Sequence, residues 1–202
     1  MPDPPMDRAA VRDAWDRLAE PYAATRDPDG PDAALIESEL DLSSDDRALD
    51  LGCGDGARTL ANLPRESVGL DLSRRCCELA RDAGHRAVQG EMTALPFDAD
   101  SFDAATAYHA VFHVPRADHG AVYREVARVL RPGAPLLATV GSGRSESVRR
   151  GWLGTDASML FSSPGGDETE RLLRDAGFAV AWRRRVADPF GGGVPMVLAR
   201  AP

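Results

Sequence analysis

The stretch that decides the fold is Ala48–Ala57, which reads ALDLGCGDGA. Apolar residues alternate with Asp50 and then give way to three glycines, Gly52, Gly54 and Gly56. This pattern predicts a buried strand that turns sharply into a loop and then into a helix over 57–63. Glycine lets the backbone take a positive φ and lets a ligand lie against the main chain. The stretch therefore predicts a loop that binds a nucleotide-type cofactor.

Two cofactor classes fit the glycine spacing, because Gly52, Gly54 and Ala57 also satisfy the dinucleotide fingerprint G-x-G-x-x-G/A. The charges of the loop separate them. A dinucleotide would place its pyrophosphate beside Asp50 and Asp55, and a like-charge contact at about 4 Å costs about 4 kcal/mol at an effective dielectric of about 20. S-adenosylmethionine carries an ammonium and a sulfonium, which neighbouring carboxylates stabilise. The charges favour S-adenosylmethionine.

Four later segments, together with the glycine loop, resemble the class I S-adenosylmethionine-dependent methyltransferases, in the small-molecule, ubiquinone-biosynthesis-like "methyltransferase 11" branch. The segments are VGLDLS at 68–73, GEMTALPF at 90–97, SFDAATAYHAVFHV at 101–114 and EVARVLRPGAPLL at 125–137. They follow in the order of the family and cover about the middle half of the chain. The resemblance implies transfer of a methyl group to an O, N or C nucleophile of a small, partly apolar acceptor.

The resemblance also implies roles for single residues in binding S-adenosylmethionine. Asp71, at the end of the second strand, would hold the ribose hydroxyls, and Glu91 with Met92 would hold the adenine. Ala107 would lie near the methyl group, and Tyr22 would reach the methyl donor from an N-terminal helix. The complete cofactor-binding set is Asp50, Gly52, Cys53, Gly54, Gly56, Asp71, Leu72, Glu91, Met92, Ala107 and Tyr22.

No catalytic residue is assigned from the sequence, because methyl transfer requires little beyond alignment of the two reactants. Tyr108, His109 and His113 form a titratable cluster, and each is a candidate general base. Phe112 replaces the first histidine of the family's His-His pair, so no role is carried over from that pair. His119 is expected at the surface, at the start of a helix.

The hydrophobic pattern predicts one doubly wound, Rossmann-like α/β domain with helices on both faces. Its seven-stranded sheet is mostly parallel, and the last strand is antiparallel. Strands are expected at 48–51, 67–72, 86–89, 101–108, 135–140, 180–186 and 194–200, and helices at 6–24, 33–40, 57–63, 74–83, 117–130 and 168–176. Ser73, directly after the second strand, is expected to be the N-cap of the helix at 74–83. Pro28, Gly30 and Pro31 separate the first two helices, and Pro189 with Gly191–Gly193 joins the last two strands.

Two regions carry more specific expectations. Residues 1–45 are expected to form a helical cap on the methyltransferase domain of residues 46–202. The Gly- and Ser-rich stretch over 141–166 is expected to be an irregular lid that closes on a hydrophobic or aromatic acceptor. Asp167 and Glu170 resemble a capping box for the helix that follows.

Composition limits the partners and the location. A net charge of −8 argues against a nucleic-acid groove, and Arg183–Arg185 is interpreted as a charged strand edge. Three cysteines without a C-x-x-C pair predict neither a disulfide framework nor a metal site. The sequence lacks a signal-peptide pattern and a long apolar run, so a cytoplasmic protein without a membrane partner is expected.

Two other functions are compatible with the same sequence motifs. The rival functions are an NAD(P)-dependent oxidoreductase that uses the same glycine loop and a non-catalytic protein that binds S-adenosyl ligands. The acceptor and the oligomeric state are undetermined. All basic residues are Arg and none is Lys, which suits either a GC-rich genome or a salt-adapted cytoplasm.

Overall fold

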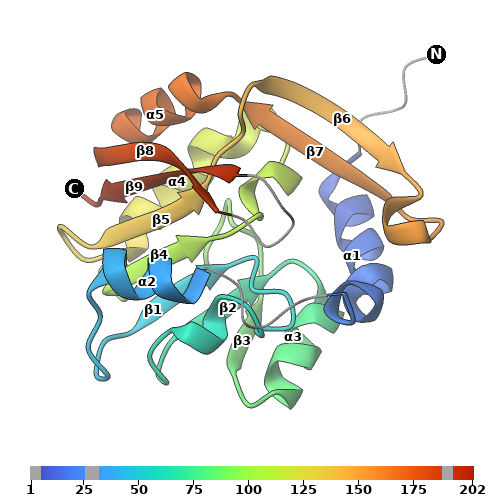
Figure 1. The fold of residues 1–202 in the computed structure, drawn as a ribbon, viewed down its shortest axis with the longest axis horizontal. Coiled ribbons are helices and arrows are strands. Elements are labelled where there is room, and N and C mark those ends of the chain that lie inside the picture. The colour runs from blue at the N-terminus through green and yellow to red at the C-terminus, as the bar shows by residue number, and fades with distance from the viewer. Residues whose placement is uncertain (1–5, 26–31, 188–192) are drawn as a thin grey trace.

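The main sheet is described in a computed structural model that covers residues 6–25, 32–187 and 193–202. Its strand order is β3-β2-β1-β4-β5-β9-β8 (Figure 1). The strands are β1 (Ala48–Leu51), β2 (Val68–Asp71), β3 (Arg86–Gln89), β4 (Ala104–Ala107), β5 (Pro135–Thr139), β8 (Ala179–Ala187) and β9 (Gly193–Arg200). Strands β1 to β5 pair in parallel, whereas β9 pairs antiparallel with β5 and β8. The predicted doubly wound, seven-stranded sheet is confirmed.

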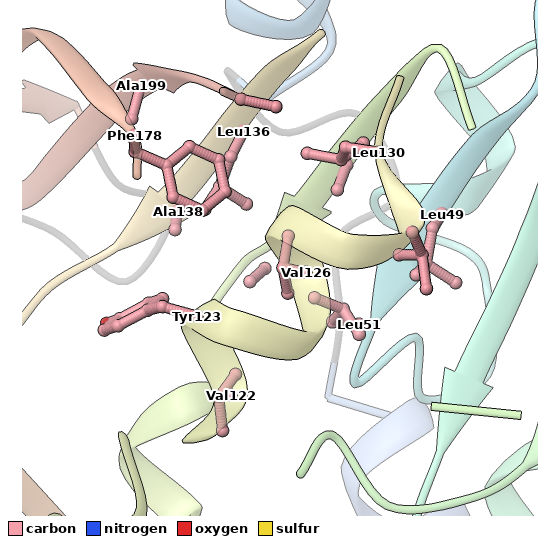
Figure 2. Close-up of a cluster of buried hydrophobic side chains, with 14 of the residues drawn as sticks. Leu49, Leu51, Val122, Tyr123, Val126, Leu130, Leu136, Ala138, Phe178 and Ala199 are labelled. Atoms are coloured by element: carbon pink, nitrogen blue, oxygen red, sulfur yellow. The ribbon is translucent and has the colours of Figure 1, made fainter. Parts of the chain in front are cut away.

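Helices cover both faces of this sheet: α2 (Asp32–Leu40) and α3 (Arg74–Asp82) lie on one face, α4 (His119–Val129) and α5 (Gly166–Asp175) on the other. Helix α1 (Arg8–Ala23) lies off the sheet and contacts α3. Figure 2 shows Val122 and Val126 of α4 beside Leu49 and Leu51 of β1, and Leu173 of α5 belongs to the same buried cluster. On the opposite face α2 and α3 contribute a second buried cluster. The break predicted at Pro28, Gly30 and Pro31 lies outside the described residues, as do residues 189–192 of the predicted connection between the last two strands.

Local signals set several of these boundaries. The Asp7 carboxylate accepts a hydrogen bond from the Ala10 N–H at 2.8 Å and caps α1. Ser73 caps α3 through the Cys76 N–H at 3.0 Å, as predicted. Two residues separate the end of β2 from the start of α3, and Asp71 lies at the carboxyl end of its strand, the edge where open α/β sheets bind ligands.

The segment after the glycine loop differs from the prediction. No α-helix forms over 57–63; turns lead instead into a short 3-10 helix, η1 (Leu60–Asn62). Gly52, Gly54 and Gly56 all have φ between 57° and 79°, values outside the right-handed helical region, so helical backbone angles are possible only after Gly56. Pro64 follows soon after, and the few residues between cannot sustain an α-helix.

The stretch over 141–166 also differs from the prediction, because it is regular. Strands β6 (Arg144–Arg150) and β7 (Ser158–Pro164) form an antiparallel hairpin, joined through a 3-10 turn, η4 (Trp152–Gly154). The hairpin lies beside α1 (Figure 1), and Met159 and Leu160 of β7 are buried with Val11 and Leu18 of that helix. An isolated hairpin is marginally stable, and this packing against a helix accounts for its order. Its role as a lid stays a prediction.

The capping box predicted at the start of α5 is wrong. The helix begins at Gly166, two residues earlier than predicted, and its N-cap Gly165 has no side chain to bond the first turn. Asp167 and Glu170 instead accept hydrogen bonds from Arg183 of β8, at 2.5 and 2.7 Å. Because β8 is the last strand of the sheet, this pairing supports the interpretation of Arg183–Arg185 as a charged strand edge.

Candidate active site

A cavity opens at the carboxyl ends of β1, β2 and β4, against α1. Its empty volume is about 790 Å³, counting space that is open to solvent. The lining residues come from α1, the glycine loop and the segments after β2, β3 and β4; they are Arg8, Val11, Trp15, Tyr22, Gly52, Gly54, Asp71, Leu72, Cys76, Gly90, Glu91, Met92, Thr93, Tyr108, His109, Ala110, His113, Val114 and Pro115.

The glycine loop is drawn tightly against the sheet. The N–H groups of Gly52 and Cys53 both donate to the Leu70 carbonyl, at 2.7 and 3.1 Å. A Cβ on Gly52 would lie 2.5 Å from the Ala110 Cβ, and the φ of Gly52 is +72°. A side chain here would therefore be strained and would clash with the cavity wall. The loop leaves bare backbone at the cavity, which fits close approach by a ligand.

Asp71 is the buried acid of the site. One carboxylate oxygen accepts from the Gly54 N–H at 3.0 Å and the other from the Ser73 N–H at 2.8 Å. Burial raises the pKa of Asp71 to about 6, although the hydrogen bonds from Ser73 and Gly54 lower it. Each oxygen retains a second lone pair, so the carboxylate fits a ligand that presents two adjacent hydroxyl groups.

Seven of the predicted cofactor residues meet at this cavity: Tyr22, Gly52, Gly54, Asp71, Leu72, Glu91 and Met92. The others do not line it. Asp50 is buried in β1 and accepts from the Thr106 Oγ1 at 2.7 Å. Cys53 is buried against Gly69, and Ala107 is buried in the core on the α4 face. Gly56 faces His85. Cofactor contacts of these four residues stay predictions.

The cysteines are buried and free. Burial raises the pKa of Cys53, Cys76 and Cys77, so their thiols stay protonated at neutral pH. Among residues 6–25, 32–187 and 193–202, no group of histidine, cysteine and acidic side chains could hold a metal ion. Within the same ranges, no helix is long and apolar enough to cross a bilayer.

Arg8 is a site residue that the sequence analysis missed. From α1 its guanidinium donates to Glu91 and Thr93, and it reaches the Asp118 carboxylate at 3.0 Å. These partners follow β3 and precede α4, so one side chain joins α1 to two loops of the cavity wall. The only local signal was the position of Arg8 in a helix that was expected to cover the cofactor. Glu91, predicted to hold adenine, thus lies beside a cation.

The titratable cluster Tyr108, His109 and His113 does line the cavity. The backbone N–H of His109 donates to the Thr139 Oγ1 at 3.1 Å, and His109 has a φ of +51°. The His113 Nδ1 lies 2.8 Å from the Leu160 carbonyl of β7. Burial lowers the pKa of His113 to about 4, so its imidazole is neutral at physiological pH.

The surface position predicted for His119 is wrong. His119 begins α4 as expected, yet it is 3% exposed. Its Nε2 lies 3.1 Å from the Val114 carbonyl and 2.9 Å from the Ser162 Oγ of β7. The β6–β7 hairpin, which was not predicted, covers this residue. Burial lowers the pKa of His119 as well.

Comparisons with known proteins agree with this geometry. Residues 49–138 match the family of the methyltransferase domain. An uncharacterized methyltransferase of Schizosaccharomyces pombe, C70.08c, is 30% identical over 175 residues, which are 76% of this chain and 67% of the relative. A tRNA (carboxymethyluridine(34)-5-O)-methyltransferase of Arabidopsis thaliana is 28% identical over 147 residues, and the chain spans only 36% of its length.

A solved structure shows the same fold. The 1,6-didemethyltoxoflavin-N1-methyltransferase of Burkholderia thailandensis superposes with a TM-score of 0.73 at 22% identity. The match covers 98% of this chain and 92% of that one. That structure contains 1,6-didemethyltoxoflavin and S-adenosylhomocysteine.

Proposed function

Because the chain belongs to the class I S-adenosylmethionine-dependent methyltransferases, we propose that it methylates an O, N or C atom of a small, partly apolar acceptor. One observation carries the proposal. A single cavity is lined both by the bare glycine loop with Asp71 and by the aromatic side chains of Trp15 and Tyr22. The first set fits an S-adenosyl ligand and the second fits an apolar acceptor, so the two reactants would meet in one place.

The cofactor side would be bound by the sheet edge. S-adenosylmethionine supplies a methyl group on a positively charged sulfur. Gly52 and Gly54 would admit the ligand to the backbone, and Asp71 would accept hydrogen bonds from the ribose hydroxyls. Glu91 and Met92 would contact the adenine, and Tyr22 would approach the methyl donor from α1.

The acceptor side would be formed by α1 and by the segment after β4. Trp15 and Tyr22 are in edge-to-face contact, with ring centroids 5.2 Å apart, and both line the cavity. Such a wall would exclude water and orient a flat apolar molecule. Alignment of two bound reactants can lower the free-energy barrier of a bimolecular reaction by about 7–11 kcal/mol. The Burkholderia enzyme, with its small heterocyclic ligand, supports this acceptor class.

A nucleic-acid acceptor is the main competitor within the family, since one relative is a tRNA methyltransferase. The net charge of −8 opposes a phosphate backbone. We expect no binding of bulk tRNA in a gel-shift assay at low salt, where electrostatic attraction would be strongest. A shifted band that higher salt abolishes would favour the tRNA class.

The dinucleotide rival is weakened by the loop itself. A pyrophosphate binds at the N-terminus of an α-helix, where free N–H groups and the helix dipole favour it. Here the glycine loop leads into turns and the 3-10 helix η1. Asp55 lies in this loop, whereas Asp50 is bonded to Thr106 and does not line the cavity.

Calorimetric titration tests the cofactor assignment. The protein is titrated in parallel with S-adenosylhomocysteine, NAD and NADP. Micromolar binding of S-adenosylhomocysteine without binding of the dinucleotides is expected; the opposite pattern would overturn the proposal. An acceptor screen that detects released S-adenosylhomocysteine then distinguishes an enzyme from a protein that only binds the ligand.

A further inference from the structure

The orientation of the His113 side chain at the cavity is closely defined by its contacts. Three aromatic rings contact its imidazole, all at steep angles: Trp15 at 5.2 Å, Phe112 at 4.6 Å and Phe161 at 5.0 Å between centroids. They come from α1, from the 3-10 helix η2 (Val111–His113) and from β7. Together with the bond to Leu160, these contacts hold the plane of the ring.

The bond to Leu160 also determines which ring nitrogen carries the proton. A backbone carbonyl oxygen can only accept a hydrogen bond, so the Nδ1 of His113, 2.8 Å away, must be the donor. In a neutral imidazole the other nitrogen then bears the lone pair. The Nε2 of His113 is therefore a hydrogen-bond acceptor.

This acceptor atom is available to a ligand. His113 lines the cavity, and within the described ranges no protein group is bonded to its Nε2. Nε2 is also absent from the fully buried polar atoms that lack a partner in those ranges, and His113 as a whole is partly exposed. Of the titratable groups nearby, His109 and Tyr108 also line the cavity.

From this geometry we infer that the acceptor substrate is a neutral molecule whose O–H or N–H donates to the Nε2 of His113, which then receives that proton. The inference rests on the proposed methyl transfer. It makes His113 a catalytic residue and narrows the acceptor to a proton-bearing nucleophile on an apolar, ring-like body. An anionic acceptor would direct its charge at the lone pair and is disfavoured.

The proton transfer balances for a hydroxyl acceptor. A lone pair of the acceptor oxygen forms the new C–O bond while the C–S bond breaks, and sulfur keeps the electron pair of that bond. The oxygen keeps the electrons of its O–H bond, and the proton moves to Nε2. His113 becomes an imidazolium whose Nδ1–H still donates to Leu160, and it later releases the proton to water. A weak base suffices, because a methylated, still protonated oxygen is strongly acidic.

The test uses nitrogen NMR of the full-length protein with labelled histidines, saturated with S-adenosylhomocysteine. At pH 7 His113 should show the Nδ1–H tautomer with an unprotonated Nε2. Matched probes that differ in one methyl group are then added: phenol and anisole, 2-naphthol and 2-methoxynaphthalene, indole and N-methylindole. At least one proton-bearing member should shift the Nε2 resonance, and its methylated partner should not.

Two variants separate this role from a structural one. His113→Asn places its amide N–H near the position of Nδ1 and can keep the bond to Leu160, but it removes Nε2. It should bind the effective probe about 3- to 10-fold more weakly and should no longer prefer it to its methylated partner. His119→Gln changes a histidine buried under the same hairpin that does not line the cavity. It should retain the preference.

Each result decides the inference. An Nε2–H tautomer, equal shifts from both members of every pair, or no Nε2 shift with any probe would overturn it. The proposed function is judged separately by titration with S-adenosylhomocysteine. If that ligand binds both the wild type and His113→Asn and the Nε2 predictions fail, only the role of His113 is lost. If it does not bind the wild type, the proposed function fails.

Discussion

The Asp71 carboxylate and the Gly54 backbone N–H are joined by a hydrogen bond of 3.0 Å, which connects the end of β2 to the glycine loop. The second carboxylate oxygen bonds the Ser73 N–H at 2.8 Å and so connects the same group to the cap of α3. Asp71 thus shapes the cavity before any ligand arrives. Substitutions there act on the loop geometry and, under the proposed function, on ligand contacts as well.

Asp71→Asn should weaken binding of S-adenosylhomocysteine. An amide can accept only through its oxygen, so its NH2 group would face one of the two backbone N–H donors. Loss of the charge-assisted bonds should cost about 1–3 kcal/mol, a rise in Kd of about 5- to 150-fold. Calorimetry measures it, with Asp13→Asn on the exposed side of α1 as the control. Unchanged affinity in a folded Asp71→Asn protein would refute the ribose assignment.

Affinity for S-adenosylhomocysteine should depend on pH through Asp71. Burial raises the pKa of this carboxyl to about 6, and two ligand hydroxyls are better accepted by the ionised form. The Kd should therefore be constant above pH 7 and rise as the pH falls through 6, by up to about tenfold per pH unit. Titrations at pH 5, 6 and 7.5 check this. The slope should disappear in Asp71→Asn, and a slope that persists there would assign the titration to another group.

Gly52→Ala should damage the cavity more than an equally strained substitution elsewhere. Its Cβ would lie 2.5 Å from the Ala110 Cβ at a φ of +72°. Gly133 has a φ of +79° with nothing within 4 Å of such a Cβ, so Gly133→Ala reports strain alone. Strain costs about 1–2 kcal/mol. Both variants should lower the melting temperature, but only Gly52→Ala should also lose ligand affinity; equal affinities would contradict the close-approach argument.

Thr106→Val should destabilise the fold through Asp50. The Thr106 Oγ1 donates to the buried Asp50 carboxylate at 2.7 Å between β4 and β1. Valine has nearly the same shape but cannot donate, so a buried carboxylate oxygen loses its donor. The free energy of unfolding should fall by about 1–3 kcal/mol in urea denaturation. Thr25→Val, at an exposed site, should change it by less than about 0.5 kcal/mol. Equal effects would mean that the buried bond contributes no net stability.

Much of the ligand-binding edge was predictable because its signals are local. Strand β3 was predicted at its observed residues, and Ser73 caps α3 as its position after a strand suggested. The alternation of apolar residues with Asp50 before Gly52, and the position of Asp71 at the end of β2, are both visible within a few residues of sequence. Sheet geometry then brings the carboxyl ends of parallel strands together, which places Gly52 near Asp71 without further information.

The predictions for 57–63 and 141–166 were wrong in opposite directions: a helix was expected over 57–63 and does not form, and irregular structure was expected over 141–166 where a hairpin forms. In the first case strong helix-forming residues could not overcome three positive-φ glycines and Pro64. In the second case, the Gly- and Ser-rich segment over 141–166 forms a hairpin because its buried face packs against Val11 and Leu18 of α1. Packing against a distant helix stabilises this hairpin, and the composition of the segment does not indicate that contact.

The sequence by itself determined the glycine loop, the parallel sheet and the acid at its edge, because short-range spacing and strand direction are enough for these. Only the tertiary structure decided the polar contacts of the cavity. Arg8 bonds Glu91 across 83 residues, and Leu160 sets the tautomer of His113 across 47. Such pairs form when separate elements pack together, and neither partner shows in its own sequence neighbourhood which group it will meet.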